Sequence, residues 1–495
     1  MREGEARAEG ISNELWLGRS LARLALPLPF LQSRMVQLLS DSLLHDPRVA
    51  QAKQLLLSAL SDHQRHITGP RSATSDLREA YAQSLTRFAE IRGGPLYYPY
   101  LASGIGRGPL VELADGSVKY DMITGIGVHY LGHSHPALLE SSIDAALCDT
   151  IMQGNLQQHR ASLDVSQALV DFATQNGASL RHAFLTTSGA MANENALKLV
   201  LSKKSPASRI LAFEHTFAGR SFVLSQITDK PAYRAGLPTV VNVDYVPFFD
   251  HTRPKESTAQ AVAVLKSHLA RYPKQHAVMW MELVLGEGGY YAGDRDFFVS
   301  LLDVLKSHNV AVGFDEIQTF GRTTQPFALQ HFGLDRYADV ATVGKLTQIC
   351  ATLFTDEFKP PPGLVSQTFT GATSSLLAAR TILNLLKTGD FFGLEGRIIR
   401  LRNRFVSRLE EIGARHPGWV NGPFGLGSMI AFTPFSGDEP VVKRFLTTLF
   451  DLGVVAFICG SSPYRTRFLM PPAAIADEDI DAVCAIVERA LEAVA

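Results

Sequence analysis

The sequence has no excess of charge of either sign, few cysteines and no long apolar run. Its 47 Lys and Arg residues are balanced by 48 Asp and Glu residues, which gives a formal net charge of −1. Because there is no basic excess to neutralise phosphates, a nucleic-acid-binding protein is not expected. No apolar stretch reaches the roughly 20 residues that a membrane-spanning helix needs, so a membrane partner is not expected either.

The four cysteines lie far apart in the chain of 495 residues, at Cys148, Cys350, Cys459 and Cys484. Such spacing indicates neither a disulfide framework nor a zinc site, and no metal is expected. The first residues include several glutamates before any apolar stretch, which fits neither a secretory signal nor a transit peptide. A cytoplasmic protein is the resulting expectation.

Residues 1–92 differ in pattern from the rest of the chain. Residues 35–44 and 50–60 repeat apolar side chains at helical spacing, and Gly69-Pro70 marks a break. We predict a helical N-terminal extension over residues 1–92 that packs against the body or against a partner subunit.

From about residue 93, short apolar strands alternate with helices. The predicted strands are residues 183–187, 209–213, 277–283, 310–314 and 339–343, with helices at 192–203 and 297–308. This order indicates an α/β fold with a mostly parallel central sheet, in a large domain over residues 93–388. Residues 389–495 are expected to form a smaller α/β C-terminal domain, with which the first segment of the large domain is shared.

Ligands of such sheets bind beyond the carboxyl ends of the strands. The candidates at those positions are Asp315, Glu316, Lys345 and the segment 188–194. Each has an ordinary alternative: a capping carboxylate, a lysine that extends to solvent, or a tight strand-to-helix turn. Glu282 and Glu287 flank a glycine-rich turn, where acids are usually solvated. Residues 104–108 resemble a phosphate loop but precede a strand, so we interpret them as a turn leading into residues 109–113.

Taken in order, several blocks resemble the class III aminotransferases, pyridoxal-phosphate enzymes of fold type I. The blocks are residues 120–127, 132–136, 188–194, 217–220, 282–289, 315–319 and 344–345. The resemblance runs from about Gly104 to the C-terminus and implies pyridoxal 5′-phosphate as the cofactor.

The resemblance implies a role for each matching residue near the cofactor ring. Lys345 would form the Schiff base with pyridoxal phosphate and move the proton during turnover. Asp315 would pair with the pyridine nitrogen, Gln318 would hydrogen-bond the phenolic oxygen, and Phe217 would stack on the ring.

Other matches concern the phosphate and the partner subunit. Ser188, Gly189 and Ala190 would bind the phosphate at a helix N-terminus. Thr368 matches the threonine that reaches the phosphate from the other subunit, which implies a homodimer with shared active sites.

The matches that concern the substrates are Arg220, Glu287 and a C-terminal arginine. Arg220 would bind the substrate carboxylate through its planar fork. Glu287 would pair with Arg467, although the spacing to the following prolines leaves Arg465 open as the partner.

The resemblance predicts an aminotransferase that uses an amino acid or ω-amine donor, similar to lysine, ornithine or acetylornithine. The expected acceptor is 2-oxoglutarate in a ping-pong reaction. A decarboxylase or aminomutase of the same fold remains an alternative, as does a non-catalytic subunit.

Overall fold

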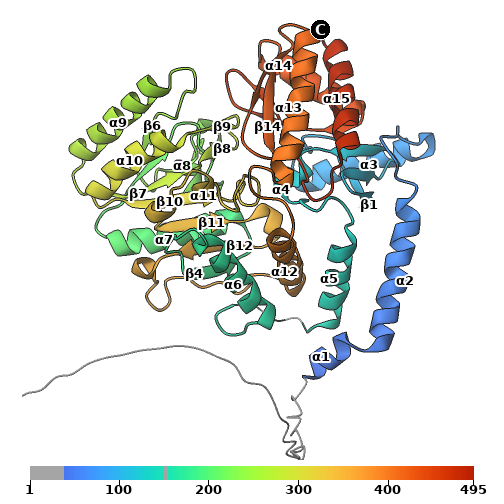
Figure 1. Ribbon diagram of the computed structural model, residues 1–495, viewed down its shortest axis with the longest axis horizontal. Helices are drawn as coiled ribbons and strands as arrows, with labels where there is room; N and C mark the ends of the chain where they lie inside the picture. The colour runs from blue at the N-terminus through green and yellow to red at the C-terminus, as the bar shows by residue number, and fades with distance from the viewer. Residues whose placement is uncertain (1–37, 150, 152–153) are drawn as a thin grey trace, which may run out of the picture.

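The computed structural model describes residues 38–149, 151 and 154–495. The acidic N-terminus and the first part of the predicted extension, including Met35, lie outside these residues. Figure 1 shows two bodies side by side, one built around the largest sheet and one built from the C-terminal helices, with α1 and α2 along one side.

The largest sheet has seven strands. In spatial order they are β4 (His182–Thr186), β12 (Cys350–Phe354), β11 (Val340–Val343), β10 (Ala311–Glu316), β7 (His276–Met281), β5 (Arg209–Phe213) and β6 (Val243–Val246). Strand β12 runs antiparallel to β4 and β11, whereas the other neighbouring pairs are parallel. The predicted mostly parallel sheet is therefore confirmed.

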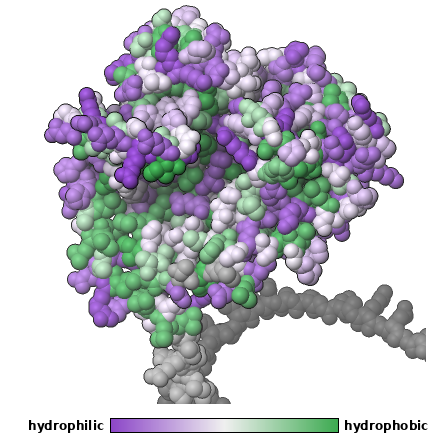
Figure 2. Space-filling model, turned by 180° about the vertical axis from the view of Figure 1, so that it is seen from behind, coloured by the Kyte–Doolittle hydropathy of each residue, from purple (hydrophilic) through white to green (hydrophobic). Residues whose placement is uncertain are grey.

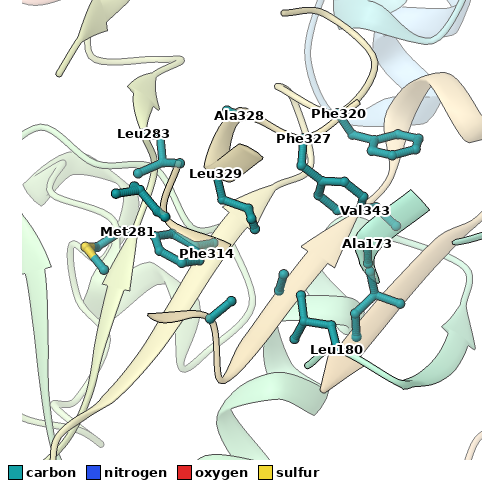
Figure 3. Close-up of a cluster of buried hydrophobic side chains, with 14 of the residues drawn as sticks. Ala173, Leu180, Met281, Leu283, Phe314, Phe320, Phe327, Ala328, Leu329 and Val343 are labelled. Atoms are coloured by element: carbon teal, nitrogen blue, oxygen red, sulfur yellow. The ribbon is translucent and has the colours of Figure 1, made fainter. Parts of the chain in front are cut away.

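Helices cover both faces of this sheet because successive strand residues point to opposite sides. Leu211 and Phe213 pack in the same core as the buried residues of α6 (Arg160–Thr174), α9 (Pro254–Arg271) and α10 (Arg295–Ser307). Ile210 and Ala212 pack instead with α7 (Gly189–Lys204). Figure 3 shows part of the first core, where Phe314 lies close to Met281 and Leu329.

Helix α10 illustrates how the sequence determines these elements. Its buried residues recur at intervals of three and four, at Phe297, Phe298, Leu301, Leu302 and Leu305. Asp294 precedes the helix, and its Oδ1 accepts a hydrogen bond of 2.7 Å from the backbone N–H of Phe297. Periodicity and cap together fix a helix over the segment predicted at 297–308.

The remaining helices of the first body lie around the sheet or in its connections: α5 (Pro136–Leu147), α8 (Leu224–Ile227), α11 (Ala328–His331) and α12 (Thr373–Thr388). Short strands β8 (Val284–Leu285) and β9 (Tyr291–Ala292) form a separate hairpin. Searched over the described residues, no helix combines the length and apolarity needed to cross a bilayer.

The second body contains three long helices and two small sheets. Its helices are α13 (Arg397–Arg415), α14 (Glu439–Asp451) and α15 (Asp477–Glu492), and one sheet has the order β13 (Val420–Phe424), β14 (Met429–Pro434), β17 (Arg465–Leu469) and β16 (Phe457–Cys459). The other joins β1 (Ala102–Arg107), β2 (Leu110–Leu113) and β3 (Val118–Asp121) to β15 (Val454–Val455). Strand β3 pairs in parallel with β15, so an early segment is built into the C-terminal body. The domain limits at residues 92 and 388 stay a prediction.

Residues 38–92 form α1 (Leu39–Leu44), α2 (Pro47–Gln64) and α3 (Arg78–Arg92). Lys53 in α2 forms an ion pair of 2.5 Å with Asp144 in α5, and Gln64 donates to the Gly106 carbonyl at 2.7 Å. Leu39 and Leu55 are largely exposed, and hydrophobic atoms gather on this side of the molecule (Figure 2). The extension thus contacts the body with one face and presents apolar residues on another.

The interpretation of residues 104–108 as a turn is wrong, because most of this segment lies in β1. The strand pairs antiparallel with β2, and its register shifts between Ala102 and Gly106. Gly104 at this bulge and Gly108 at the hairpin both have positive φ, of 108° and 57°. The glycines therefore serve an irregular hairpin and do not form a phosphate loop.

Arg322 joins the two bodies at their common boundary. Its guanidinium is fully buried and donates to the carbonyls of Gly127 at 2.7 Å and Met470 at 3.1 Å. It also donates to Ser428 Oγ at 3.3 Å. Arg322, in the loop after β10 of the first body, thus forms hydrogen bonds to the segments that follow β3 and β17 in the second body.

Candidate active site

A cavity of 430 Å³ lies beyond the carboxyl ends of β5, β7, β10 and β11. Eight of the eleven predicted site residues line it: Gly189, Ala190, Phe217, Arg220, Glu287, Asp315, Gln318 and Lys345. The strand-end rule predicted Asp315, Lys345 and the segment 188–194, the resemblance added the others, and the fold brings both sets to one cavity.

Lys345 follows β11 after a single glycine, at the start of a short 3₁₀ turn. Its backbone is left-handed, with φ of 55°. Burial lowers the pKa of its amine, against the opposing effect of Asp315. A buried amine with a lowered pKa is more often neutral and therefore more nucleophilic, as Schiff-base chemistry requires.

Asp315 lies at the end of β10, inside the strand and not after it as expected. Its Oδ2 accepts from Asn193 Nδ2 at 2.7 Å, and its Oδ1 accepts from the Ile317 N–H at 3.0 Å. Asn193 is in turn oriented by Thr342, whose hydroxyl donates to Asn193 Oδ1 at 2.7 Å. Burial raises the pKa of Asp315, while these donors and Lys345 act to lower it.

Sequence reasoning missed Asn193 and Thr342 as the residues that orient Asp315. Asn193 belongs to the block 188–194 that resembles the family, and nothing in its spacing distinguishes it from any other residue on a face of α7. All four residues of β11 are buried, so Thr342 has the pattern of an ordinary residue of a central strand.

Glu282 is buried, so the expectation of a solvated acid is wrong at this position. One oxygen, Oε2, accepts from the Phe217 N–H at 2.6 Å and from the Thr216 hydroxyl at 3.0 Å. The other, Oε1, accepts from the Gly286 N–H at 3.0 Å. Burial and the nearby Asp315 raise the pKa of Glu282 from 4.5 to about 8.

We expect Glu282→Gln to lower the free energy of unfolding by about 1–3 kcal/mol. The amide has one acceptor oxygen, so Phe217 N–H or Gly286 N–H must face an NH₂ group. Because the folded pKa of Glu282 is raised to about 8, its stabilising effect is greatest at low pH and declines as pH rises from about 5 to 8. Thermal unfolding should show a larger difference in Tm between wild type and variant at pH 6 than at pH 9. A constant difference would contradict this account.

Glu287 pairs with Arg467, and Arg465 has a different environment. Arg467 Nη2 lies 2.5 Å from Glu287 Oε1, and its Nη1 donates to the Gly286 carbonyl at 2.9 Å. Arg465 instead donates to the Gly289 carbonyl at 2.6 Å. Burial acts to raise the pKa of Glu287, but Arg467 lowers it overall, so the two side chains form an ionised pair.

Two features fit the binding of pyridoxal phosphate. Gln318 lines the cavity, and its buried Oε1 has no hydrogen-bond partner within the described part of the chain, so its amide is free to turn its NH₂ group toward a ligand. Gly189 and Ala190 begin α7, where the first N–H groups lack helical partners. A Cβ on Gly189 would lie 2.9 Å from the Ile317 side chain, so any larger residue at the start of α7 would force Ile317 to move.

Phe217 and Arg220 also line the cavity, and both contact the ring of Tyr233. The Arg220 guanidinium lies 4.0 Å from the centre of the Tyr233 ring, and the Phe217 and Tyr233 rings meet edge-on at 6.4 Å. Arg220 remains exposed at the mouth of the cavity, where it can bind an incoming carboxylate.

Three predicted residues do not line this cavity: Ser188, Thr368 and Arg467. Ser188 caps α7, since its Oγ accepts from the Met191 N–H at 3.2 Å. Arg467 lies behind Glu287. Thr368 is exposed on the segment before α12.

The family model for aminotransferase class III matches residues 99–491. Among curated relatives, the acetylornithine aminotransferase of Methanocaldococcus jannaschii is 29% identical over 76% of this chain and 90% of its own length. The L-lysine-epsilon aminotransferase of Mycobacterium tuberculosis is 28% identical over 78% of this chain and 90% of its own. The acetylornithine aminotransferase of Corynebacterium efficiens is 31% identical over 77% of this chain and 90% of its own length.

Solved structures show the same fold. The lysine aminotransferase from M. tuberculosis, in its internal aldimine form, has a TM-score of 0.74 at 23% identity, over 83% of this chain and all of that one. The ornithine aminotransferase from Toxoplasma gondii has a TM-score of 0.70 at 22% identity, over 84% of this chain and 98% of that one. At these identities the likeness shows the fold alone, which is fold type I.

The fold and the family match together define a pyridoxal-phosphate-dependent transaminase. The chain belongs to the class III aminotransferases.

Proposed function

We propose that the protein transfers the terminal amino group of an amino acid donor to 2-oxoglutarate by a ping-pong mechanism. The observation that supports this most directly is the ion pair of Glu287 with the fully buried Arg467 beside the cavity that contains Lys345. An arginine that a glutamate neutralises tolerates a donor without a second carboxylate. The same arginine, once released, can bind the second carboxylate of a dicarboxylic oxo acid.

Pyridoxal phosphate, when bound, supplies an electron sink for the carbanion that forms as a substrate C–H bond breaks. Lys345 would bind the cofactor through its amine and, once released, would take and return the substrate proton. Asp315, oriented by Asn193, would hold a proton on the pyridine nitrogen. Gln318 would donate from its amide NH₂ to the phenolic oxygen, and Gly189 would donate to the phosphate from the N-terminus of α7.

An absorbance scan of the purified protein tests this function. L-lysine, L-ornithine and N-acetylornithine are added in turn, followed by 2-oxoglutarate. We expect one donor to convert the visible cofactor band to the pyridoxamine form, and 2-oxoglutarate to restore it. Carbon dioxide release in place of this cycle would indicate a decarboxylase, and a protein that cannot be loaded with cofactor would refute catalysis.

We further propose a cytoplasmic homodimer in which Thr368 of one subunit completes the phosphate site of the other. The exposed position of Thr368 and the exposed apolar residues of α1 and α2 support this assembly. The N-terminal helices would then cover the flank of the dimer.

We expect Thr368→Ala to weaken cofactor binding by about tenfold, the effect of one lost hydrogen bond to a charged group, with little change in kcat at saturating cofactor. The dissociation constant is measured by titrating cofactor-free protein and following absorbance. Ser374→Ala removes a hydroxyl from an exposed position in the first turn of α12 and is the matched control, with cofactor affinity expected to equal that of wild type. Unchanged cofactor affinity in Thr368→Ala would contradict the cross-subunit assignment.

A further inference from the structure

Tyr233 contacts two side chains of the active-site cavity but does not itself line the cavity. The Arg220 guanidinium carbon lies 4.0 Å over the centre of the Tyr233 ring, and the Phe217 ring meets that ring edge-on at 6.4 Å. Within the described part of the chain, Arg220 forms no hydrogen bond and no ion pair. The ring of Tyr233 is therefore the contact that restricts the position of the Arg220 guanidinium.

A buried threonine links the two segments that contain Arg220 and Tyr233. Thr228 Oγ1 accepts from the Gly219 N–H at 3.2 Å and donates to the Gly219 carbonyl at 2.9 Å. Arg234, the residue after Tyr233, donates to the Thr228 carbonyl at 2.6 Å. Because these bonds join the residue before Arg220 to the residue after Tyr233, the ring has a fixed place relative to the backbone of Arg220.

An aromatic ring holds an arginine in a different way from a carboxylate. A carboxylate would occupy the N–H groups of Arg220 and neutralise its charge, so it would compete with a substrate carboxylate. The face of an aromatic ring attracts the cation and leaves its hydrogen-bond donors unoccupied. An exposed arginine without such a contact samples many rotamers, and ordering it when a ligand binds costs conformational entropy. The contact with Tyr233 orders Arg220 in advance.

We propose that Tyr233 is a positioning residue that holds Arg220 in place for the substrate carboxylate and thereby sets the affinity for carboxylate-bearing substrates. The inference rests on the proposed function, with Arg220 as the residue that binds the carboxylate. Tyr233 acts through Arg220 and not through the chemistry at Lys345, so its effect falls on KM and leaves kcat nearly unchanged.

The test compares two donors in the holoenzyme: the best donor of the absorbance scan, which has a carboxylate, and 1,5-diaminopentane, which has none. We expect Tyr233→Leu to raise KM for the first donor by about threefold to tenfold, with kcat within about twofold of wild type and KM for 1,5-diaminopentane unchanged. Tyr233→Phe keeps the aromatic face and should retain the wild-type KM for both donors.

Tyr272→Leu is the matched control because it removes a similar contact away from the cavity. The Arg209 guanidinium carbon lies 3.7 Å over the Tyr272 ring, and Asp244 holds the same guanidinium through bonds of 2.7 and 2.8 Å. Neither KM should change in this variant. A double-mutant cycle then tests the route of the effect: in an Arg220→Met background, Tyr233→Leu should cause no further rise in KM.

Two kinetic outcomes would overturn the inference. One is an equal rise in KM with and without Arg220, and the other is a fall in kcat for both donors, which would mean that Tyr233 acts through Phe217.

If no donor is transaminated, the proposed function fails, and calorimetric binding of glutarate, which has two carboxylates and no amine, decides the role of Tyr233 by itself. We then expect glutarate to bind about threefold to tenfold more weakly to Tyr233→Leu than to Tyr272→Leu. Equal binding to the two variants, or no binding to wild type, would refute the inference.

Discussion

Replacing Lys345 with alanine is expected to lower kcat by at least about 10⁴-fold. The substitution removes both the amine that binds the cofactor and the base that moves the proton. Single-turnover kinetics with the best donor, together with the absorbance spectrum of the bound cofactor, measure the two effects separately.

Lys203→Ala, a loss of the same functional group on the exposed face of α7, should leave turnover unchanged. Added methylamine should restore part of the proton transfer in Lys345→Ala, because a small amine can enter the cavity that the side chain leaves. A variant that retains more than about a tenth of wild-type turnover would show that Lys345 is not the proton-transfer residue.

Replacing Asp315 with asparagine is expected to lower kcat by about 10²–10³-fold. The amide can still accept from Asn193 or Ile317, so the fold is largely retained while the negative charge is lost. Without that charge, a proton on the pyridine nitrogen is no longer stabilised, and carbanion formation slows. Stopped-flow measurement of the donor half-reaction gives the rate directly.

Glu316 provides a matched control because it is the neighbouring buried carboxylate on the other face of β10. It accepts from the Ala328 N–H at 3.0 Å and from the Leu329 N–H at 2.7 Å, and it does not line the cavity. Glu316→Gln should lower Tm with little effect on the half-reaction. Equal losses of half-reaction rate in Asp315→Asn and Glu316→Gln would mean that both carboxylates affect the rate only by stabilising the fold.

The catalytic positions could be predicted because parallel strands deliver their next residues to one edge. Lys345 follows β11 and Asp315 ends β10, so the two apolar runs made both residues candidates, and the family resemblance supplied their roles. The strand 209–213 was predicted with its observed limits because a strand that is buried on both faces has an almost continuous apolar sequence.

Features that depend on long-range pairing could not be predicted. The segment Cys350–Phe354 is buried throughout, and nothing in it indicates that it runs antiparallel. Arg465 and Arg467 are two residues apart in β17, so they share a face, and spacing alone cannot choose between them. The choice follows from the Gly286–Glu287 turn, which lies beside Arg467 in space and 180 residues away in the chain.

Glu282 was misinterpreted for a similar reason. A glutamate beside glycines is ordinarily solvated, and its burial depends on backbone donors from Phe217 and Gly286 that only the folded chain supplies. The signal that could have found it is its position directly after the buried strand β7.

Arg322 has a mechanical consequence for the enzyme. Because one buried guanidinium donates to Gly127, Ser428 and Met470, it ties the two bodies together deep in their boundary. Arg465 and Arg467 of β17 add bonds to the turn at residues 286–289 of the first body. A shift of one body relative to the other would break several of these buried hydrogen bonds at once, and each broken bond costs free energy. We therefore expect the boundary beside Lys345 to resist such a shift.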